Sequence, residues 1–289
     1  MAQPVVFFQG QRGAYSEEAA NIIFPGAVMV ARPTFSKVFE SLEAQPEAFA
    51  CLPIENTTAG RVSDVQLLLP RFGFQITKEH FLPVRHQLLG VAGATLSRVR
   101  EVLSHPQALA QCEHFLKEHN LTPIPFEDTA GAAAEVARRN DPTLAAIASR
   151  AAQQHYNLEI LAENIQDEQH NTTRFIVLAG SPQPIESPDP SRAFITAIWF
   201  TLKSVPAALY KAIGGFATAA LNLTKIESHL TGHRFTRAQF YIEVEGHPET
   251  DAMRHAMREL AFFADDVRVL GVFPADPYRY NGHPQEVVL

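Results

Sequence analysis

The sequence is poor in the residue patterns that support several common protein classes. Its 289 residues include only two cysteines, Cys51 and Cys112, which do not form a Cys-x-x-Cys pair. His-Glu-x-x-His is absent as well, so the familiar zinc-binding patterns do not occur and we expect no metal. We predict that both cysteines stay reduced and lie in the core, since a lone catalytic thiol is the less common role.

Charge is also scarce, at 19% of all residues, with a net charge of -7. No Lys/Arg-rich run is present to bind a phosphate backbone, which argues against a nucleic-acid partner. Apolar runs such as Phe194–Leu202 are interrupted and far too short to cross a membrane, so no membrane partner is expected. The start of the chain lacks a basic segment followed by an apolar one, so the predicted location is cytoplasmic.

The motifs of three large enzyme classes are missing too. The chain contains no Walker loop, no nucleophile elbow and no Rossmann glycine fingerprint. Phosphoryl transfer, acyl-enzyme chemistry and hydride transfer therefore have no support in the sequence. What the chain does contain is 46% hydrophobic residues, enough for real cores, over a length that favours two domains.

A proline-rich segment divides the chain. Four of the eleven residues from Ser181 to Ser191 are proline, which fixes φ and removes hydrogen-bond donors. We interpret residues 181–191 as a linker that neither a helix nor a strand continues through. The predicted organisation is a catalytic domain at 1–180, a second domain at 192–275 and a C-terminal tail at 276–289.

Before the linker, strand-like and helix-like segments alternate, which is typical of βαβ units in an α/β fold. Expected strands are 5–8, 27–31, 49–54, 102–103, 124–126, 144–148 and 175–178, and expected helices are 16–24, 35–43, 64–69, 106–118, 130–138 and 150–155. Two strand-like runs around Pro83 interrupt this rhythm at 74–93. We interpret that region as a crossing between two small, doubly wound lobes with a cleft between them.

After the linker, the order changes to strand, helix, strand, strand, helix, strand. These segments are 194–203, 207–218, 223–228, 238–245, 250–263 and 267–273. The βαββαβ order predicts a ferredoxin-like second domain.

Several loops next to the predicted strands are unusually polar; most follow a strand, where ligands of open α/β sheets bind, and the last ends at the start of a strand. The loops are 9–16, 53–62, 104–112, 128–130, 147–150 and 166–175. Each also has a structural explanation, such as a helix cap at Ser16 or Ser149, an Asx-turn at Asn56, or a salt bridge at Arg174. Alternation along a strand places Thr173 and Arg174 on opposite faces, so both reach one ligand only if the strand begins after them.

Taken together, these loops resemble the prephenate dehydratase family. The resembling segments are Gly13-Ala-Tyr-Ser16, Pro53-Ile-Glu-Asn56 with Gly60, Ser104-His-Pro-Gln-Ala-Leu-Ala-Gln-Cys112, Ala145-Ala-Ile-Ala-Ser149 and Asn171-Thr-Thr-Arg-Phe175. Each segment alone is a weak signal, but they occur in the family's order and spacing over nearly the whole chain. The second domain resembles the ACT regulatory module at Pro206-Ala-Ala-Leu209 and at Asn222-Leu-Thr-Lys-Ile-Glu-Ser228.

The resemblance implies a two-lobed, periplasmic-binding-protein-like catalytic region that converts prephenate to phenylpyruvate without a cofactor. It also implies a homodimer or homotetramer formed through the ACT domains, with L-phenylalanine as effector. The implied catalytic residues are Thr173, Asn56, Gln111 and Ser104. The implied substrate-binding residues are Arg174, as a carboxylate anchor, with Gly13, Tyr15, Ser16, Thr57, Gly60 and Ser149. The implied phenylalanine site contains Ala207, Ala208, Leu209, Asn222, Leu223, Glu227 and Ser228.

Two departures from the family pattern lie in the regulatory region. Ala207 stands where the family often has glycine, and His229-Leu230 where it often has Arg-Pro. We expect the Ala207 methyl to crowd an effector that approaches the backbone closely, which would weaken inhibition. An arogenate dehydratase and a non-catalytic small-molecule sensor remain as alternatives. Because a strand is predicted already at Val5, no N-terminal chorismate mutase is expected and the enzyme should be monofunctional.

Overall fold

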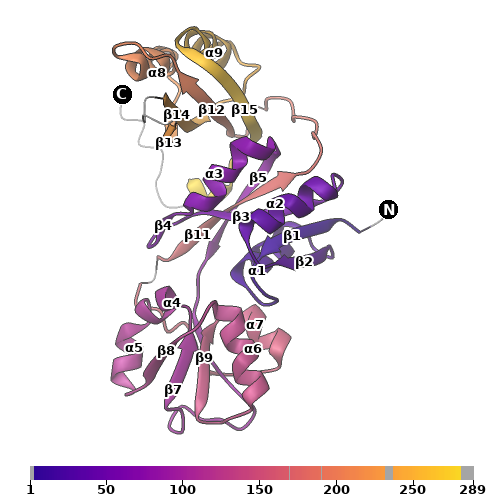
Figure 1. The fold of residues 1–289 in the computed structure, drawn as a ribbon, viewed down its shortest axis with the longest axis vertical. Coiled ribbons are helices and arrows are strands. Elements are labelled where there is room, and N and C mark those ends of the chain that lie inside the picture. The colour runs from indigo at the N-terminus through magenta and orange to yellow at the C-terminus, as the bar shows by residue number, and fades with distance from the viewer. Residues whose placement is uncertain (1–2, 169, 190, 232–236, 281–289) are drawn as a thin grey trace. The chain divides into compact units, whose positions relative to one another are not determined.

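The computed structural model of the chain describes residues 3–168, 170–189, 191–231 and 237–280. The chain forms two compact units, one of residues 1–66 with 80–176 and one of residues 67–79 with 177–289 (Figure 1). The boundaries predicted at 180, 191 and 275 stay predictions, and the end of the predicted tail, from 281 onward, lies outside the described residues. No helix in the described ranges is long and apolar enough to span a membrane.

The first lobe of unit one is built on parallel strands. β1 (Val5–Gln9) pairs in parallel with β2 (Val28–Arg32) and β3 (Phe49–Asn56), and β11 (Thr172–Ala179) lies beside β3. Helices α1 (Tyr15–Ile23) and α2 (Phe35–Ala44) follow β1 and β2, as βαβ connections require. A short strand, β4 (Gly60–Arg61), folds back onto the end of β3.

The second lobe has a mixed sheet with helices on both sides (Figure 1). Its strand order is β10 (Glu159–Ala162), β6 (Gln87–Gly90), β9 (Leu144–Ala148), β7 (Glu101–Ser104) and β8 (Thr122–Pro125). Its helices are α4 (Pro106–Ala110), α5 (Glu113–Glu118), α6 (Thr129–Arg139) and α7 (Arg150–Tyr156). Every residue of β9 is buried, because α4 and α5 cover one face of the sheet while α6 and α7 cover the other.

The alternation predicted from the sequence is confirmed, with local corrections. The crossing at 74–93 consists of β5 (Gln75–Pro83) and β6. The single helix predicted over 106–118 is wrong, since Gln111 and Cys112 separate α4 from α5. The last strand of the region begins at Thr172, earlier than predicted, and β4 and β10 were not predicted.

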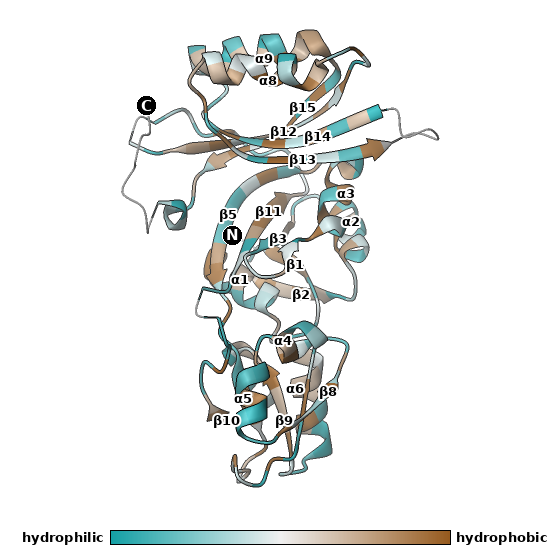
Figure 2. Ribbon diagram, turned by 90° about the vertical axis from the view of Figure 1, so that its left-hand side faces the viewer, coloured by the Kyte–Doolittle hydropathy of each residue, from teal (hydrophilic) through white to brown (hydrophobic). Residues whose placement is uncertain are grey.

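The second unit has the predicted ferredoxin-like order. Its elements are β12 (Phe194–Leu202), α8 (Ala208–Thr218), β13 (Leu223–Thr231), β14 (Arg237–Glu245), α9 (Asp251–Phe263) and β15 (Ala264–Pro274). The strands pair antiparallel in the order β13-β14-β12-β15, and both helices cover one face of this sheet (Figure 2). Ile198 and Phe200 of β12 pack there against Phe216 and Leu260 of the helices. The fold prediction of an α/β catalytic region followed by a βαββαβ domain is therefore confirmed.

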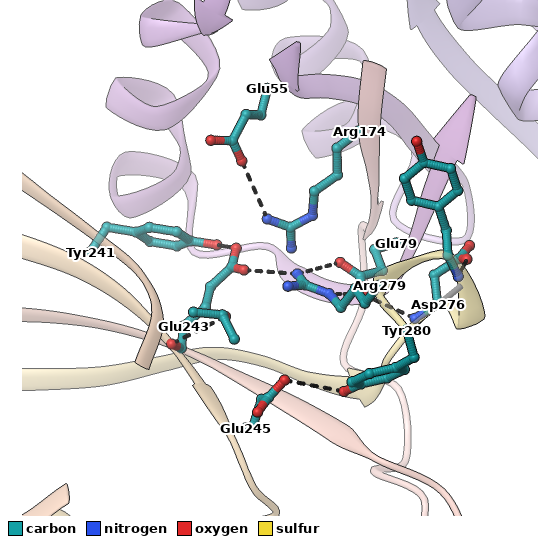
Figure 3. A network of polar contacts seen from close by, with 11 residues as sticks. Glu55, Glu79, Arg174, Tyr241, Glu243, Glu245, Asp276, Arg279 and Tyr280 are labelled. Carbon is teal, nitrogen blue, oxygen red and sulfur yellow. Dashed lines mark hydrogen bonds and ion pairs between the residues drawn. The ribbon is translucent and has the colours of Figure 1, made fainter. Parts of the chain in front are cut away.

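Within the second unit, the segment 67–79 packs with C-terminal residues. It contains the end of α3 (Ser63–Phe72) and the start of β5, which meets β15 where Ile76 pairs with Gly271. Arg279 donates to both carboxylate oxygens of Glu79, at 2.6 and 2.8 Å, and to Glu243 at 3.2 Å (Figure 3). Both carboxylate side chains are fully buried, so this guanidinium offsets charge that water cannot reach.

Candidate functional site

A cavity of about 270 Å³ lies between the two lobes of unit one. Its wall includes the carboxyl ends of β1 and β3 and the first turns of α1 and α4, the place where open α/β sheets bind ligands. The polar side chains that line it are Gln9, Tyr15, Ser16, Asn56, His86, His105, Gln107, Gln111, Asp128, Thr129, Asn171 and Thr173. Loops far apart in the sequence thus supply one polar surface.

Asn56 and Thr173 meet at this cavity. The Asn56 side-chain oxygen accepts from the backbone N–H groups of Thr58 at 3.0 Å and Ala59 at 2.8 Å, which is the predicted Asx-turn. Its Nδ2 then donates to the Thr173 hydroxyl at 2.9 Å and to the Asn171 side chain at 2.8 Å. Asn56 therefore forms the predicted Asx-turn and also contacts Thr173. Because the Thr173 oxygen accepts this bond, its own O–H stays available as a donor.

Gln111 joins loops from both lobes. Its Nε2 donates to the Thr58 hydroxyl at 2.6 Å, and its Oε1 accepts from Asn171 at 3.0 Å. The same oxygen lies 2.9 Å from Nε2 of His86. The predicted catalytic role of Gln111 stays a prediction, but these contacts show that it orders the residues around Asn56.

His86 and its partner Tyr15 line the cavity, and His86 was missed by the sequence reasoning. The Tyr15 hydroxyl lies 2.9 Å from Nδ1 of His86 and 3.0 Å from the carbonyl oxygen of Arg85. Burial lowers the pKa of His86, and burial, followed by the nearby Glu18, raises the pKa of Tyr15. A single histidine carries no motif. The one signal that could have pointed to His86 is its position shortly after Pro83, in the crossing between the lobes.

Three predicted site residues hold the loops around the cavity. Ser149 caps α7 by accepting from Ala152 N–H at 3.0 Å, as predicted, and donates to the Gly13 carbonyl at 2.6 Å. Gly13 has a φ of +86°, and a Cβ there would lie 2.6 Å from the Ala152 backbone. Ser104 is fully buried and donates to the Ile147 carbonyl at 2.6 Å. In this arrangement the three residues serve the architecture, and their direct roles toward substrate stay predictions.

The remaining loop residues lie close to Asn56 or at α1. Thr57 accepts from Thr172 N–H at 2.9 Å and donates to the His170 carbonyl at 2.9 Å. Gly60 adopts a φ of +78° where β4 turns back on β3. Ser16 lines the cavity, but the prediction that it caps α1 is wrong, because Ala14 is the N-cap and makes no side-chain capping bond.

Arg174 lies on the other face of β11 from Thr173. The strand begins at Thr172, so the condition under which both side chains reach one ligand is not met. The Arg174 guanidinium is almost fully buried and lies 3.9 Å from the Glu55 carboxylate (Figure 3). It does not line the cavity in this arrangement, so its predicted role as carboxylate anchor stays a prediction that requires Arg174 to turn.

The predicted phenylalanine-binding residues of unit two gather near the start of α8 and along β13. Ala207 is the N-cap of α8 with a φ of +57°, a left-handed conformation that favours glycine. Ala208 and Leu209 face the core, and Asn222 donates to Glu245 at 3.0 Å. Leu223, Glu227 and Ser228 lie on β13, an edge strand.

Comparison with known proteins agrees with this geometry. The family model described as prephenate dehydratase matches residues 6–183. The "Bifunctional N-acyl-homoserine lactone acylase/prephenate dehydratase" of Komagataeibacter europaeus is 41% identical over 275 residues, covering 95% of this chain and 97% of that protein. The chloroplastic "Arogenate dehydratase/prephenate dehydratase 2" of Arabidopsis thaliana is 41% identical over 280 residues, covering 94% of this chain and 73% of that protein.

A solved structure shows the same fold. The prephenate dehydratase of Arthrobacter aurescens in complex with L-Phe superposes with a TM-score of 0.84 at 26% identity, covering 94% of this chain and 92% of that one. At 94% coverage of this chain, the match extends over both units. On this evidence the chain belongs to the prephenate dehydratase family of lyases.

Proposed function

We propose that this chain converts prephenate to phenylpyruvate, releasing CO2 and water, in phenylalanine biosynthesis. The observation that carries the proposal is the Thr173 hydroxyl, whose oxygen accepts from Asn56 at the edge of the cavity. Mixing the purified protein with prephenate and recording the ultraviolet absorbance of phenylpyruvate tests it. Absence of phenylpyruvate from folded protein would reject the proposal and leave an arogenate dehydratase or a non-catalytic sensor, which the same assay with arogenate distinguishes.

The proposed chemistry needs orientation and hydrogen-bond donors. As the ring carboxylate leaves as CO2, the electron pair of its C–C bond enters the ring and hydroxide leaves from the opposite carbon. That hydroxide takes up one proton from the bulk solution, so prephenate dianion and one proton give phenylpyruvate, CO2 and water, and the product is aromatic. The Thr173 hydroxyl is too weak an acid to transfer a proton easily, so it stabilises the departing oxygen by donating a hydrogen bond.

The pyruvyl carboxylate of the substrate needs a partner of its own. We retain Arg174 for this role, since a guanidinium forms a rigid fork for carboxylates, and the role requires Arg174 to turn away from Glu55. The first backbone N–H groups of α1, at Tyr15 and Ser16 beside the cavity, offer a second partner. Tight pairing to the ring carboxylate instead would oppose loss of CO2.

Arogenate is a second candidate substrate, because Asp128 lines the cavity. Arogenate carries an ammonium where prephenate has a keto group, and a carboxylate is the natural partner of an ammonium. Asp128 caps α6 by accepting from Gly131 N–H at 2.7 Å through Oδ1, while Oδ2 accepts only a long bond of 3.5 Å from Gln11, which an ammonium group could replace. Competition between the two substrates, repeated with Asp128→Asn, separates the candidates, since only arogenate turnover should depend on that charge.

We further propose that phenylalanine regulates the enzyme through unit two. The proposal is supported by the L-Phe complex of the Arthrobacter aurescens relative. Edge strand β13 exposes Ile226 and Leu230, which favours a second copy of the chain pairing there into a homodimer or homotetramer. Light scattering with and without phenylalanine, together with calorimetry, measures both the assembly and the binding.

A further inference from the structure

The direction of the hydrogen bonds around the cavity can be deduced from two backbone groups. Backbone N–H groups are donors only, so the N–H groups of Thr58 and Ala59 require the oxygen of the Asn56 amide on their side. The nitrogen of that amide therefore faces Thr173 and Asn171. Thr173 must accept this bond, and its O–H then points elsewhere.

The same argument continues to Gln111. Since Asn171 accepts from Asn56 through its oxygen, its nitrogen is the group that faces Gln111 and donates to Oε1 at 3.0 Å. The nitrogen of Gln111 then donates to the Thr58 hydroxyl at 2.6 Å, and that hydroxyl donates onward to Asn56 at 2.8 Å. No amide in this set is free to flip without losing a bond.

The argument ends at His86 and Tyr15. Oε1 of Gln111 is an acceptor, so Nε2 of His86, 2.9 Å away, must carry the proton. A neutral His86 then has its lone pair at Nδ1, 2.9 Å from the Tyr15 oxygen, so the single Tyr15 proton faces Nδ1 in preference to the Arg85 carbonyl at 3.0 Å. Burial supports this state, because it lowers the pKa of His86 and keeps Tyr15 protonated by raising its pKa.

We propose that Tyr15 and His86 are positioning residues that direct the Thr173 O–H into the cavity through a one-way chain of hydrogen bonds. The chain runs from Tyr15 to His86, Gln111, Thr58, Asn56 and Thr173, and each member donates to the next. Bonds aligned in one direction polarise one another, which makes the last donor stronger. The proposal rests on the dehydratase function proposed above.

The first test removes the first hydrogen bond of the one-way chain. Tyr15→Phe deletes only the hydroxyl and should lower kcat by about 10- to 100-fold with little change in KM, as for other residues that orient a catalytic group. The matched control is Tyr156→Phe. Tyr156 also has a hydroxyl that donates to a carbonyl, that of Arg12 at 2.9 Å, but it takes no part in the chain of hydrogen bonds. The control should keep wild-type kcat.

The second test asks whether Tyr15 acts through Thr173. In a Thr173→Ala background, Tyr15→Phe should have no further effect on kcat, because the donor at the end of the chain is already gone. If the two losses multiply, Tyr15 acts by another route and the proposal is wrong. If wild type itself makes no phenylpyruvate, the proposed function fails instead, so the two failures are distinguishable.

The third test reverses one link. Gln111→Glu keeps the shape but replaces the donor to Thr58 by an acceptor, so the Thr58 hydroxyl turns toward Glu and leaves Asn56. We expect kcat to fall by about 10- to 100-fold while the melting temperature stays close to wild type. A kcat within twofold of wild type would show that catalysis does not depend on the direction of the hydrogen bonds.

The fourth test asks for rescue at His86. His86→Gln restores a donor toward Gln111, whereas His86→Leu cannot, so the glutamine variant should have the higher kcat of the two. Equal kcat values in two folded variants would contradict the proposal. If His86→Leu fails to fold, the kcat values of Gln111→Glu and Tyr15→Phe still test the proposal.

Discussion

Asn56 Nδ2 donates to the Thr173 hydroxyl at 2.9 Å, although 117 residues separate the two in the sequence. Asn56 ends β3 and Thr173 is the second residue of β11, and these strands are neighbours in the sheet. The pair therefore depends on strand pairing, which holds it in place before any substrate arrives. Such preorganised donors account for much of the rate enhancement in enzymes.

Replacing Thr173 tests this pair directly. Thr173→Ala should lower kcat by about 10²- to 10³-fold and change KM much less, because the lost bond is strongest in the transition state. Thr173→Ser keeps the hydroxyl and serves as the control. Steady-state kinetics with prephenate measures both, and an alanine variant within twofold of wild type would remove Thr173 from the mechanism.

The role of Arg174 can be decided by comparing it with its partner. If Arg174 binds substrate, Arg174→Lys should raise KM, because lysine keeps the charge but loses the fork. Glu55→Gln should then lower KM, since it removes the carboxylate charge that lies 3.9 Å from the Arg174 guanidinium. An unchanged KM in both variants, with a lower melting temperature for Arg174→Lys, would assign Arg174 to the fold alone.

His86 makes stability depend on pH. Its folded pKa lies below the ordinary histidine value because of burial, so the unfolded chain binds the extra proton first as the pH falls. The free energy of unfolding should therefore decrease on acidification through about pH 6.5 and recover as the pH rises. Melting temperatures of wild type should fall more than those of His86→Gln between about pH 7.5 and pH 5.5, while His155→Gln, at an exposed site, should follow wild type.

Ala207 combines backbone strain with a place in the proposed phenylalanine site. Its φ of +57° costs a residue with a Cβ about 1 kcal/mol, so Ala207→Gly should raise the free energy of unfolding by about that amount. The removed methyl should also allow phenylalanine to approach the backbone more closely and bind more tightly, as calorimetry on the full-length chain would record. A higher free energy of unfolding without tighter phenylalanine binding would show that the strain at Ala207 is independent of the effector site.

Arg279 should be far more important for stability than an exposed arginine in a similar ion pair. Arg279→Met removes the guanidinium between the buried Glu79 and Glu243 carboxylates and should cost about 3–5 kcal/mol. The control is Arg192→Met, which removes an exposed pair with Glu186 and should cost less than about 1 kcal/mol. Urea unfolding measures both variants, and equal costs would contradict the importance assigned to burial.

The sequence by itself determined most of the order of elements and the polar loops that form the candidate site. Alternating apolar segments and the βαββαβ order depend on local periodicity, and the loops at 53–62 and 166–175 carry their polar residues in consecutive positions. Asn56 stands at the end of β3 and Thr173 near the start of β11, so their meeting follows from the placement of β11 beside β3.

Only the tertiary structure decided which side chains face the cavity. Arg174 follows Thr173 directly, yet it lies on the opposite strand face beside Glu55, because β11 begins one residue before Thr173. His86 contacts Tyr15 and Gln111 across 71 and 25 residues, and no local pattern records such contacts. The direction of a hydrogen-bond chain is set by which donor meets which acceptor in space, and the order of residues along the chain does not contain that information.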